Sequence, residues 1–327
     1  MEPLLQIEDL EITFGRGSGA VRAASGVSFS VYPGEVLGVV GESGSGKSIT
    51  ALSVMGLLSK QGRVTGGRIL FEGRDLLKLS EGQLDELRGT RIGMIFQDIM
   101  YSLNPVLTIG LQMTEGMRRH MGLSKAEASG RAIELLGRTG IRDAAQVMKK
   151  YPHQLSGGMR QRVMIAMALA CGPSLLIADE PTTALDVTIQ LQIMQLLREL
   201  QQERGMAILL ITHDLGIVAE TADRAVVMYA GQCVEEAPVA ELLHHPAHAY
   251  TRALMQAVPG LHDSRDKRLY SIPGRVPDVY GDIAGCRFAG RCAYADTCAH
   301  RQDDAMRQIG EGHFSRCDLR KEAMPDG

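Results

Sequence analysis

GESGSGKS, residues 41–48, follows the apolar run VLGVV (36–40) and precedes the helix-forming segment ITALSVMGLL (49–58). The pattern G-x-x-x-x-G-K-S between a strand and a helix is typical of a loop that binds nucleotide phosphates. Its glycines let backbone N–H groups face the phosphates, and the helix N-terminus adds positive potential. A Gly-rich turn without this role would not need Lys and Ser at these offsets. The predicted ligands of the phosphates and of Mg²⁺ are Gly41, Ser43, Gly44, Ser45, Gly46, Lys47 and Ser48.

A second motif, LLIADEP (175–181), is an apolar strand that ends in two adjacent carboxylates. Two ionised groups at the end of a buried strand are costly unless a cation or a reaction uses them. We therefore expect Asp179 to hold the Mg²⁺ shell and Glu180 to polarise a water for attack on the γ phosphate. The alternative is a strand end with two solvated acids.

A third motif, LSGGMRQR (155–162), begins another helix. Ser156, Gly157 and Gly158 form a second anion-binding helix N-terminus in the same chain. The phosphates of one nucleotide already have a complete set of donors at residues 41–48. The second set therefore indicates either a second ligand or the nucleotide of a partner chain.

The composition of the 327-residue chain excludes several protein classes. Its 35 basic and 38 acidic residues leave a net charge of −3, which argues against a protein that binds nucleic acid through phosphate contacts. No apolar run approaches the roughly 18 residues of a membrane span, and the N-terminus MEPLLQIEDLEI is unlike a signal peptide. We expect a cytoplasmic chain, in which thiols stay reduced. Four of its six cysteines follow residue 285, which favours a metal site.

The spacing of apolar residues predicts the secondary structure. Strand-like apolar runs, separated by amphipathic segments, are VLGVV (36–40), RIGMIF (91–96), SLLIAD (174–179), AILLIT (207–212) and RAVVMY (224–229). This alternation predicts a parallel sheet covered on both faces. The first 35 residues and residues 64–76 alternate like antiparallel strands. Residues 98–160 contain no convincing strand, and Ser80 and Ser124 each begin a capping-box pattern, so a mostly helical block is expected there.

An ordered set of motifs resembles the ATP-binding-cassette (ABC) ATPases over residues 4 to about 250. The set comprises GESGSGKS, Gln97 after a strand, LSGGM, LLIADEP, ALD (184–186) and His213 after AILLIT. The resemblance implies binding of ATP and Mg²⁺, and head-to-tail pairing in which the LSGGM of one cassette closes over the ATP of the other. None of the expected catalytic positions is substituted, so the resemblance implies an ATPase.

The resemblance also implies roles for single residues. Gln97 would belong to the Mg²⁺ site and link it to a transmembrane partner, and His213 would contact the γ phosphate. Asp186 would lie at the dimer seam. Phe14 would stack on adenine, although a lone aromatic residue at a strand end is often a core residue instead. The implied catalytic residues are Glu180, His213 and Gln97, the Mg²⁺ residues are Ser48, Gln97 and Asp179, and all phosphate-handling residues precede Asp214.

The predicted fold class is α/β: a P-loop NTPase core of the ABC type, with an antiparallel β subdomain, a helical subdomain and a small cysteine-containing C-terminal extension. The expected core comprises residues 1–97, which include the antiparallel strands, and residues 161–250. The helical subdomain with LSGGM is expected at 98–160, and the extension at 251–327. The extension is rich in Pro and Gly near its start, as a loop-built module would be.

The run from YPHQLSGGM to DVTIQ (151–190) closely resembles the ATPases of dipeptide and oligopeptide importers. HPAHAYTRALM (245–255) is also similar, with Ala249 where proline is usual. The resemblance implies an ATPase subunit at the cytoplasmic face of the plasma membrane, which drives uptake through two permease chains. Its other implied partners are a second cassette, related or identical, and indirectly an extracytoplasmic peptide-binding protein. A nickel or chelate cargo stays open, and the alternative function is an ATP- and redox-responsive regulatory protein.

Cys286, Cys292, Cys298 and Cys317 are separated by five, five and eighteen residues. The C-x-x-C pair of most structural zinc sites is absent, and convergence of these residues needs a looped backbone. Wide spacing suits a [4Fe–4S] cluster better than one tetrahedral ion. The resemblance agrees, because some peptide-importer ATPases hold such a cluster on a similar cysteine pattern. Zinc and free thiols are the alternatives, and nothing local directs Cys317 to the other cysteines. The histidines at 244, 245 and 248 are expected in a solvated turn before a helix, and a metal site is the alternative for them.

Overall fold

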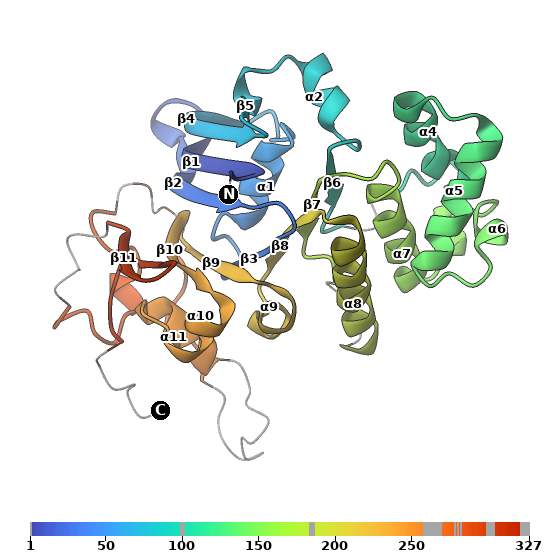
Figure 1. Ribbon diagram of the computed structural model, residues 1–327. Coiled ribbons are helices and arrows are strands. Elements are labelled where there is room, and N and C mark those ends of the chain that lie inside the picture. Colours follow the sequence, from blue (N-terminus) through green and yellow to red (C-terminus); the bar gives the residue numbers. More distant parts are fainter. Residues whose placement is uncertain are drawn as a thin grey trace. The chain divides into compact units, whose positions relative to one another are not determined.

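The computed structural model describes residues 2–98, 102–182, 187–257, 270–277, 279, 281, 283–298 and 305–320 (Figure 1). The chain divides into two compact units. Unit 1 comprises Met1–Leu4, Val31–Glu35 and Lys78–Ile211, and unit 2 comprises Leu5–Ser30, Val36–Leu77 and Thr212–Gly327.

Unit 2 contains an antiparallel sheet built from the N-terminal part of the chain. In the order β2-β1-β4-β5, its strands are Val21–Val31, Leu5–Phe14, Gly62–Phe71 and Arg74–Asp75. β1 and β4 pair antiparallel from Leu5 opposite Phe71 to Phe14 opposite Gly62. Burial alternates over the first residues of β1, with Leu5 and Ile7 buried, as a sheet with one covered face requires. The predicted antiparallel strands are confirmed.

A second group of strands in unit 2 combines a parallel and an antiparallel part. In the order β11-β12-β10-β9-β3, the strands are Arg307–Gly310, His313–Ser315, Gln232–Pro238, Arg224–Tyr229 and Val36–Val40. β3 and β9 are parallel, whereas β9, β10, β12 and β11 pair antiparallel in turn. The C-terminal hairpin β11–β12 therefore extends the edge formed by β10.

Unit 2 contains seven helices among its described residues. They are α1 (Lys47–Val54), η1 (Gly17–Gly19), η2 (Leu76–Lys78), α9 (Leu215–Thr221), α10 (Val239–His244), α11 (Ala249–Gln256) and η4 (Ala289–Arg291). Helices α9, α10 and α11 pack around a core that includes the C-terminal extension. One buried cluster joins Val227 and Tyr229 of β9 to Tyr250 of α11 and to Phe288 and Cys317 of the extension. The extension thus shares its core with the strands that surround it, which a segment too small to bury its own core requires.

A buried carboxylate attaches β12 to β10. The side chains of Glu235 and His313 are fully buried, and His313 Nε2 lies 2.7 Å from a Glu235 carboxylate oxygen. The same carboxylate accepts hydrogen bonds from the backbone N–H groups of Ala247 and His248, at 2.7 and 2.8 Å. A buried carboxylate is stable only with such partners. This contact therefore helps to determine where β12 attaches.

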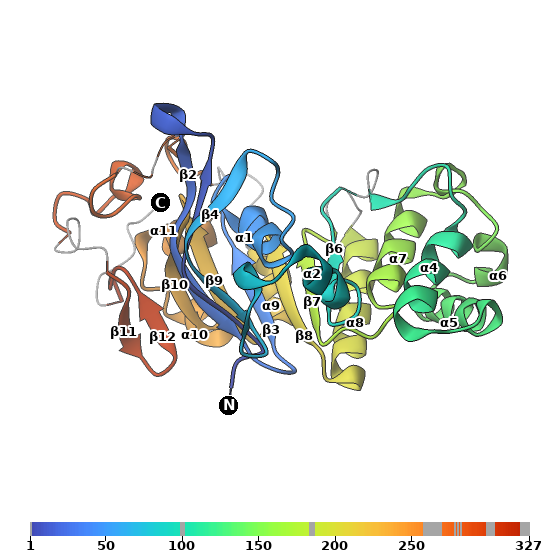
Figure 2. The same ribbon diagram turned by 90° about the horizontal axis from the view of Figure 1, so that it is seen from above.

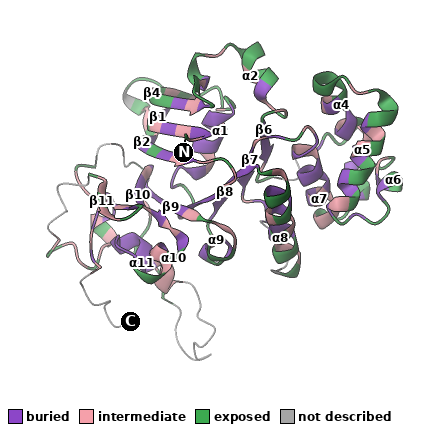
Figure 3. Cartoon of the chain, viewed as in Figure 1, coloured by how far each residue is buried: buried purple, intermediate pink, exposed green. Residues whose placement is uncertain are grey.

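Unit 1 carries three parallel strands in the order β8-β7-β6. They are Ala207–Thr212, Leu175–Asp179 and Ile92–Ile95, and every residue in them is buried (Figure 3). β6 pairs parallel with β7, and β7 with β8. The continuous apolar runs predicted this arrangement, because strands of a parallel sheet are covered on both faces.

The rest of unit 1 is mostly helical, as predicted. Its helices are α2 (Glu81–Leu87), α4 (Ile109–Met121), α5 (Lys125–Arg138), α6 (Ala144–Val147), η3 (Pro152–Gln154), α7 (Gly157–Ala168) and α8 (Val187–Arg204). Helices α4 to α7 lie together around one apolar cluster (Figure 2). Ser80 and Ser124 form the predicted capping boxes of α2 and α5, with Gln83 and Glu127 as their reciprocal partners.

Candidate functional site

GESGSGKS forms the turn between β3 and α1 in unit 2, and two of its glycines are required by the local structure. A Cβ on Gly41 would lie 2.1 Å from the Met228 carbonyl oxygen. Gly46, at φ +98°, is the N-cap residue of α1, and a Cβ there would lie 2.9 Å from the Ala23 carbonyl oxygen. Larger residues would push the loop away from these strands. The sequence pattern therefore corresponds to a loop that is packed tightly against its own unit.

Lys47 lies beneath this loop. Its side chain is buried, and Nζ donates hydrogen bonds to the carbonyl oxygens of Gly41, at 2.7 Å, and Glu42, at 3.0 Å. Ser43 and Gly44, at the tip, are exposed, whereas Ser45 is fully buried and Ser48 is half-buried. The exposed residues of the loop thus lie near the positive N-terminal end of α1. The ammonium group of Lys47 holds the first residues of the loop in place through its two hydrogen bonds.

In unit 1, β7 ends in the predicted pair of carboxylates. Asp179 is buried, and Glu180 follows it with a φ of +46°, a backbone conformation that residues other than glycine rarely adopt. The Gln97 side-chain amide donates a hydrogen bond of 3.1 Å to the Glu180 carboxylate. Such strain clusters at functional sites. The structure therefore brings Gln97 and Glu180 into direct contact at the end of β7.

LSGGM forms the start of α7. Ser156 is the N-cap residue, and its hydroxyl accepts a hydrogen bond from Met159 N–H at 3.4 Å. Ser156 and Gly157 are exposed. A Cβ on Gly157 would meet no described atom within 4 Å, and one on Gly158 would only touch Ile189 at 4.0 Å. Unlike Gly41 and Gly46, these glycines are therefore not required by contacts within the described chain.

The other predicted nucleotide residues are distributed over both units. His213 is exposed after β8 in unit 2, directly before Asp214, whose carboxylate caps α9. Phe14 ends β1, half-buried, and a Cβ on Gly62 would lie 2.8 Å from its ring. Asp186 lies outside the described residues. GESGSGKS, His213 and Phe14 belong to unit 2, and Gln97, Asp179, Glu180 and LSGGM to unit 1.

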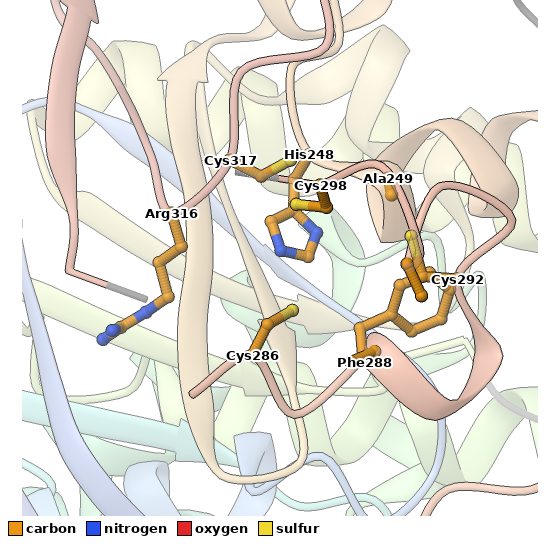
Figure 4. Close-up of a pocket in the computed structure, with 10 residues that line it drawn as sticks. His248, Ala249, Cys286, Phe288, Cys292, Cys298, Arg316 and Cys317 are labelled. Carbon is orange, nitrogen blue, oxygen red and sulfur yellow. The ribbon is translucent and has the colours of Figure 1, made fainter. Parts of the chain in front are cut away.

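The structure brings the four C-terminal cysteines to one pocket, which we call the cysteine pocket (Figure 4). Cys286, Cys292 and Cys298 come from the loops around η4, and Cys317 follows β12. Phe288 anchors these loops because its ring packs against two tyrosine rings of the core, at centroid distances of 5.2 and 5.3 Å. The pocket is lined by His248, Ala249, Cys286, Phe288, Ala289, Cys292, Ala295, Cys298, Arg316 and Cys317.

The cysteine pocket is not a formed metal site. Among the described residues, no three His, Cys, Asp or Glu side chains gather closely enough to hold one metal ion. None of the six cysteines forms a disulfide. Burial, and secondarily the neighbouring Cys298, raises the pKa of Cys317 to about 12, so this thiol is protonated at neutral pH. The predicted iron–sulfur cluster therefore has no structural support beyond four thiols around a shared, largely apolar pocket.

The helix expected after His244, His245 and His248 is present as α11, but the expectation that His248 is solvated was wrong. His244 and His245 are exposed, but His248 is buried and lines the cysteine pocket. Its Nδ1 accepts a hydrogen bond of 3.1 Å from Tyr250 N–H, so it caps α11. The sequence contained a signal for this role, since His248 stands directly before the helical segment AYTRALMQ.

Two families match the chain in succession. The ABC transporter family matches residues 24–183, and the C-terminal region of oligopeptide/dipeptide transporters matches residues 234–298. A probable peptide ABC transporter ATP-binding protein of Sinorhizobium fredii is 52% identical over 315 residues, covering 96% of this chain and 94% of that protein. The dipeptide transport ATP-binding protein DppD of Escherichia coli is 50% identical over 314 residues, which are 96% of each chain.

This chain belongs to the ATP-binding subunits of ABC peptide transporters. Two solved ABC structures resemble the cassette of this peptide-transporter subunit. The dimeric post-hydrolysis cassette MJ0796, bound to ADP and Pi, has a TM-score of 0.66 and 29% identity, covering 72% of this chain and 98% of that one. CbiO1 of Clostridium perfringens has a TM-score of 0.62 and 32% identity, with coverages of 74% and 91%. The predicted ABC ATPase fold is confirmed.

The peptide-transporter subunit is thus an ATPase of the ABC type, for which ATP and Mg²⁺ are the expected substrate and metal. Relatives named as transport subunits match nearly its whole length. The alternative of a redox-responsive regulatory protein gains no support from them. Within the described part of the chain, no helix is long and apolar enough to cross a membrane.

Proposed function

We propose that this chain hydrolyses ATP to drive uptake of dipeptides or oligopeptides through two separate permease subunits at the cytoplasmic face of the plasma membrane. The observation that supports the proposal is that two helices of one chain, α1 and α7, begin at glycine-containing motifs. Contacts within unit 2 require Gly41 and Gly46 of GESGSGKS, whereas no close contact among the described residues requires Gly157 or Gly158 of LSGGM. In a pair of cassettes, both GESGSGKS and LSGGM would have a nucleotide to bind. The peptide cargo comes from the names of the relatives.

The proposed ATP site is built from the residues of the predicted motifs. The backbone of residues 41–46 and Lys47 bind the phosphates, and Phe14 stacks on adenine. Ser48, Gln97 and Asp179 hold Mg²⁺, which neutralises charge developing on the phosphates. Glu180 accepts a proton from the attacking water, and the hydrogen bond from Gln97 orients its carboxylate. His213 contacts the γ phosphate.

The proposed partner cassette completes each ATP site. Ser156, Gly157 and Gly158 bind the phosphates held by the partner, and Asp186 lies at the seam between the cassettes. A related chain is the favoured partner and an identical copy is the other candidate. An extracytoplasmic binding protein delivers the peptide to the permeases.

A surface hollow on unit 1 is the proposed contact with a permease. It begins directly after Gln97 along the chain, and its lining includes Leu103, Pro105, Leu107 and Met167. Val106, between two lining residues, is 75% exposed. An exposed apolar side chain beside a partly apolar hollow favours a protein partner.

Val106→Asp is expected to lower recovery of the permeases with the tagged chain about tenfold, because burying an unpaired carboxylate in the contact is unfavourable. ATP-driven uptake of a labelled dipeptide into vesicles should fall in parallel, with ATP binding unchanged. The matched control is Val279→Asp, at a 60% exposed valine of unit 2. Unchanged permease recovery would contradict the contact surface. An intact complex that takes up neither dipeptides nor oligopeptides would contradict the cargo.

The cysteine pocket is proposed to bind a [4Fe–4S] cluster. Four thiols lining one largely apolar pocket support this proposal. The irons of a [4Fe–4S] cluster occupy separate corners of a cube, so that each cysteine binds a different iron, whereas a zinc ion needs all its ligands around one point. Thiols that share a pocket without converging on one point suit a cube better.

Protein purified without air is expected to absorb near about 400 nm and to contain roughly four irons per chain, as four thiolate-ligated corners require. Cys298→Ser should abolish the absorbance and most of the iron. Cys171→Ser, at a half-buried thiol of unit 1, should leave both unchanged. Stoichiometric zinc without iron would falsify the cluster.

A further inference from the structure

The cysteine-bearing extension contacts the phosphate-binding loop within unit 2. Arg291, the residue before Cys292, forms an ion pair with Glu42, the second residue of GESGSGKS. Arg291 Nη1 lies 2.8 Å from Glu42 Oε2, and Nη2 lies 3.1 Å from Oε1. Two parallel hydrogen bonds between a guanidinium and a carboxylate are stronger and more directional than a single contact.

The surroundings of Arg291 hold its guanidinium in place. Its side chain is 7% exposed, against 30% for Glu42. Nε donates a hydrogen bond of 2.7 Å to the Pro273 carbonyl oxygen, and the guanidinium lies 5.7 and 5.9 Å from the ring centroids of Tyr229 and Phe288. The hydrogen bond to Glu42 raises the pKa of Arg291. Because these contacts hold the guanidinium of Arg291 in place, the guanidinium determines the position of the Glu42 carboxylate.

The backbone of Glu42 is also held from the C-terminal side. Its N–H donates a hydrogen bond of 2.8 Å to the hydroxyl of Tyr250, and the Tyr250 ring packs against Phe288. Residues after 245 thus fix both the main chain and the side chain of this loop residue. The predicted phosphate-handling residues all precede Asp214. The contact with Glu42 therefore adds a contribution of the C-terminal extension to the predicted ATP site.

We propose that Arg291 is a positioning residue for ATP binding, which acts by neutralising Glu42 and fixing its place in the loop. An unpaired carboxylate in a loop that receives a triphosphate would repel the ligand, and an unanchored loop would have to be ordered on binding. The inference rests on the proposed assignment of GESGSGKS as the ATP site.

Nucleotide affinity of the full chain, measured by titration with a fluorescent ATP analogue, tests this role. Arg291→Ala is expected to weaken binding about 5- to 20-fold, with kcat of the assembled complex at saturating ATP within about twofold. Arg291→Lys should recover part of the loss, because lysine keeps the charge without the two-point contact. Glu42→Ala removes both the anchor and the repelling charge, so it should weaken binding less than Arg291→Ala.

The double variant separates positioning from a merely structural role. With Glu42→Ala already present, Arg291→Ala should change the affinity less than twofold, because its effect passes through Glu42. The matched control is Arg320→Ala, which removes a two-point pair with Asp318 of the same extension and should leave affinity unchanged.

Two results would overturn the role of Arg291: unchanged affinity in Arg291→Ala, or a full loss of affinity that persists in the double variant. If Arg291→Ala fails to fold, Arg291→Lys alone decides, because unchanged affinity in this folded variant would also overturn the role. A wild-type chain that binds no ATP would instead contradict the assignment of the loop.

Discussion

Glu180→Gln is expected to lower ATP turnover at least about 100-fold, because general-base assistance typically contributes a factor of that size or more. The amide keeps the shape of the side chain and can still accept the hydrogen bond from Gln97, but it cannot take the proton of the attacking water. ATP affinity should stay within about threefold, and the cassette pair should accumulate in a closed, ATP-bound state. Single-turnover hydrolysis and nucleotide titration on the same preparation separate the two quantities.

Glu199→Gln is the matched control for this variant. Glu199 is an exposed residue of α8 in the same unit, and its substitution makes the same change of charge away from the end of β7. Its turnover should equal that of the wild type. If Glu180→Gln kept more than about a tenth of the wild-type rate, a loss below roughly 1.4 kcal/mol in barrier, the catalytic role of Glu180 would be wrong.

Ser156→Arg is expected to reduce hydrolysis by the assembled complex about 100-fold while the variant chain still binds ATP. The N–H groups at the start of α7 are exposed, so a bulky cation there would block approach of the partner's phosphates and leave GESGSGKS intact. The measurement is photocrosslinking of labelled ATP to the variant chain, beside hydrolysis by a complex whose other cassette is wild type.

The loss of a helix cap needs its own control, because removing a capping serine costs about 1 kcal/mol of stability. Ser124→Arg removes the equivalent N-cap of α5 in the same unit and should change hydrolysis less than twofold. If Ser156→Arg abolished nucleotide labelling of its own chain, LSGGM would act on the ATP of the same chain, and the proposed pairing would fail.

Much of the fold could be predicted because its determinants are local. A period of two in β1, continuous apolar runs in β6 to β8 and capping boxes at Ser80 and Ser124 each specify one element from neighbouring residues. GESGSGKS was recognisable for the same reason, since its strand, loop and helix are consecutive in the chain. Gly41 and Gly46 show why the pattern is strict: any larger residue meets backbone atoms.

The sequence by itself determined the elements, the motif residues and the family resemblance, but not the contacts of the C-terminal extension. Cys317 reaches the cysteine pocket because β12 pairs with β10 and the buried Glu235 binds His313, and both β10 and Glu235 lie far from Cys317 in the sequence. Arg291 meets Glu42 across 249 positions, and His248 is buried rather than solvated. Such contacts depend on which distant surfaces exclude water together, so only the tertiary structure decided them.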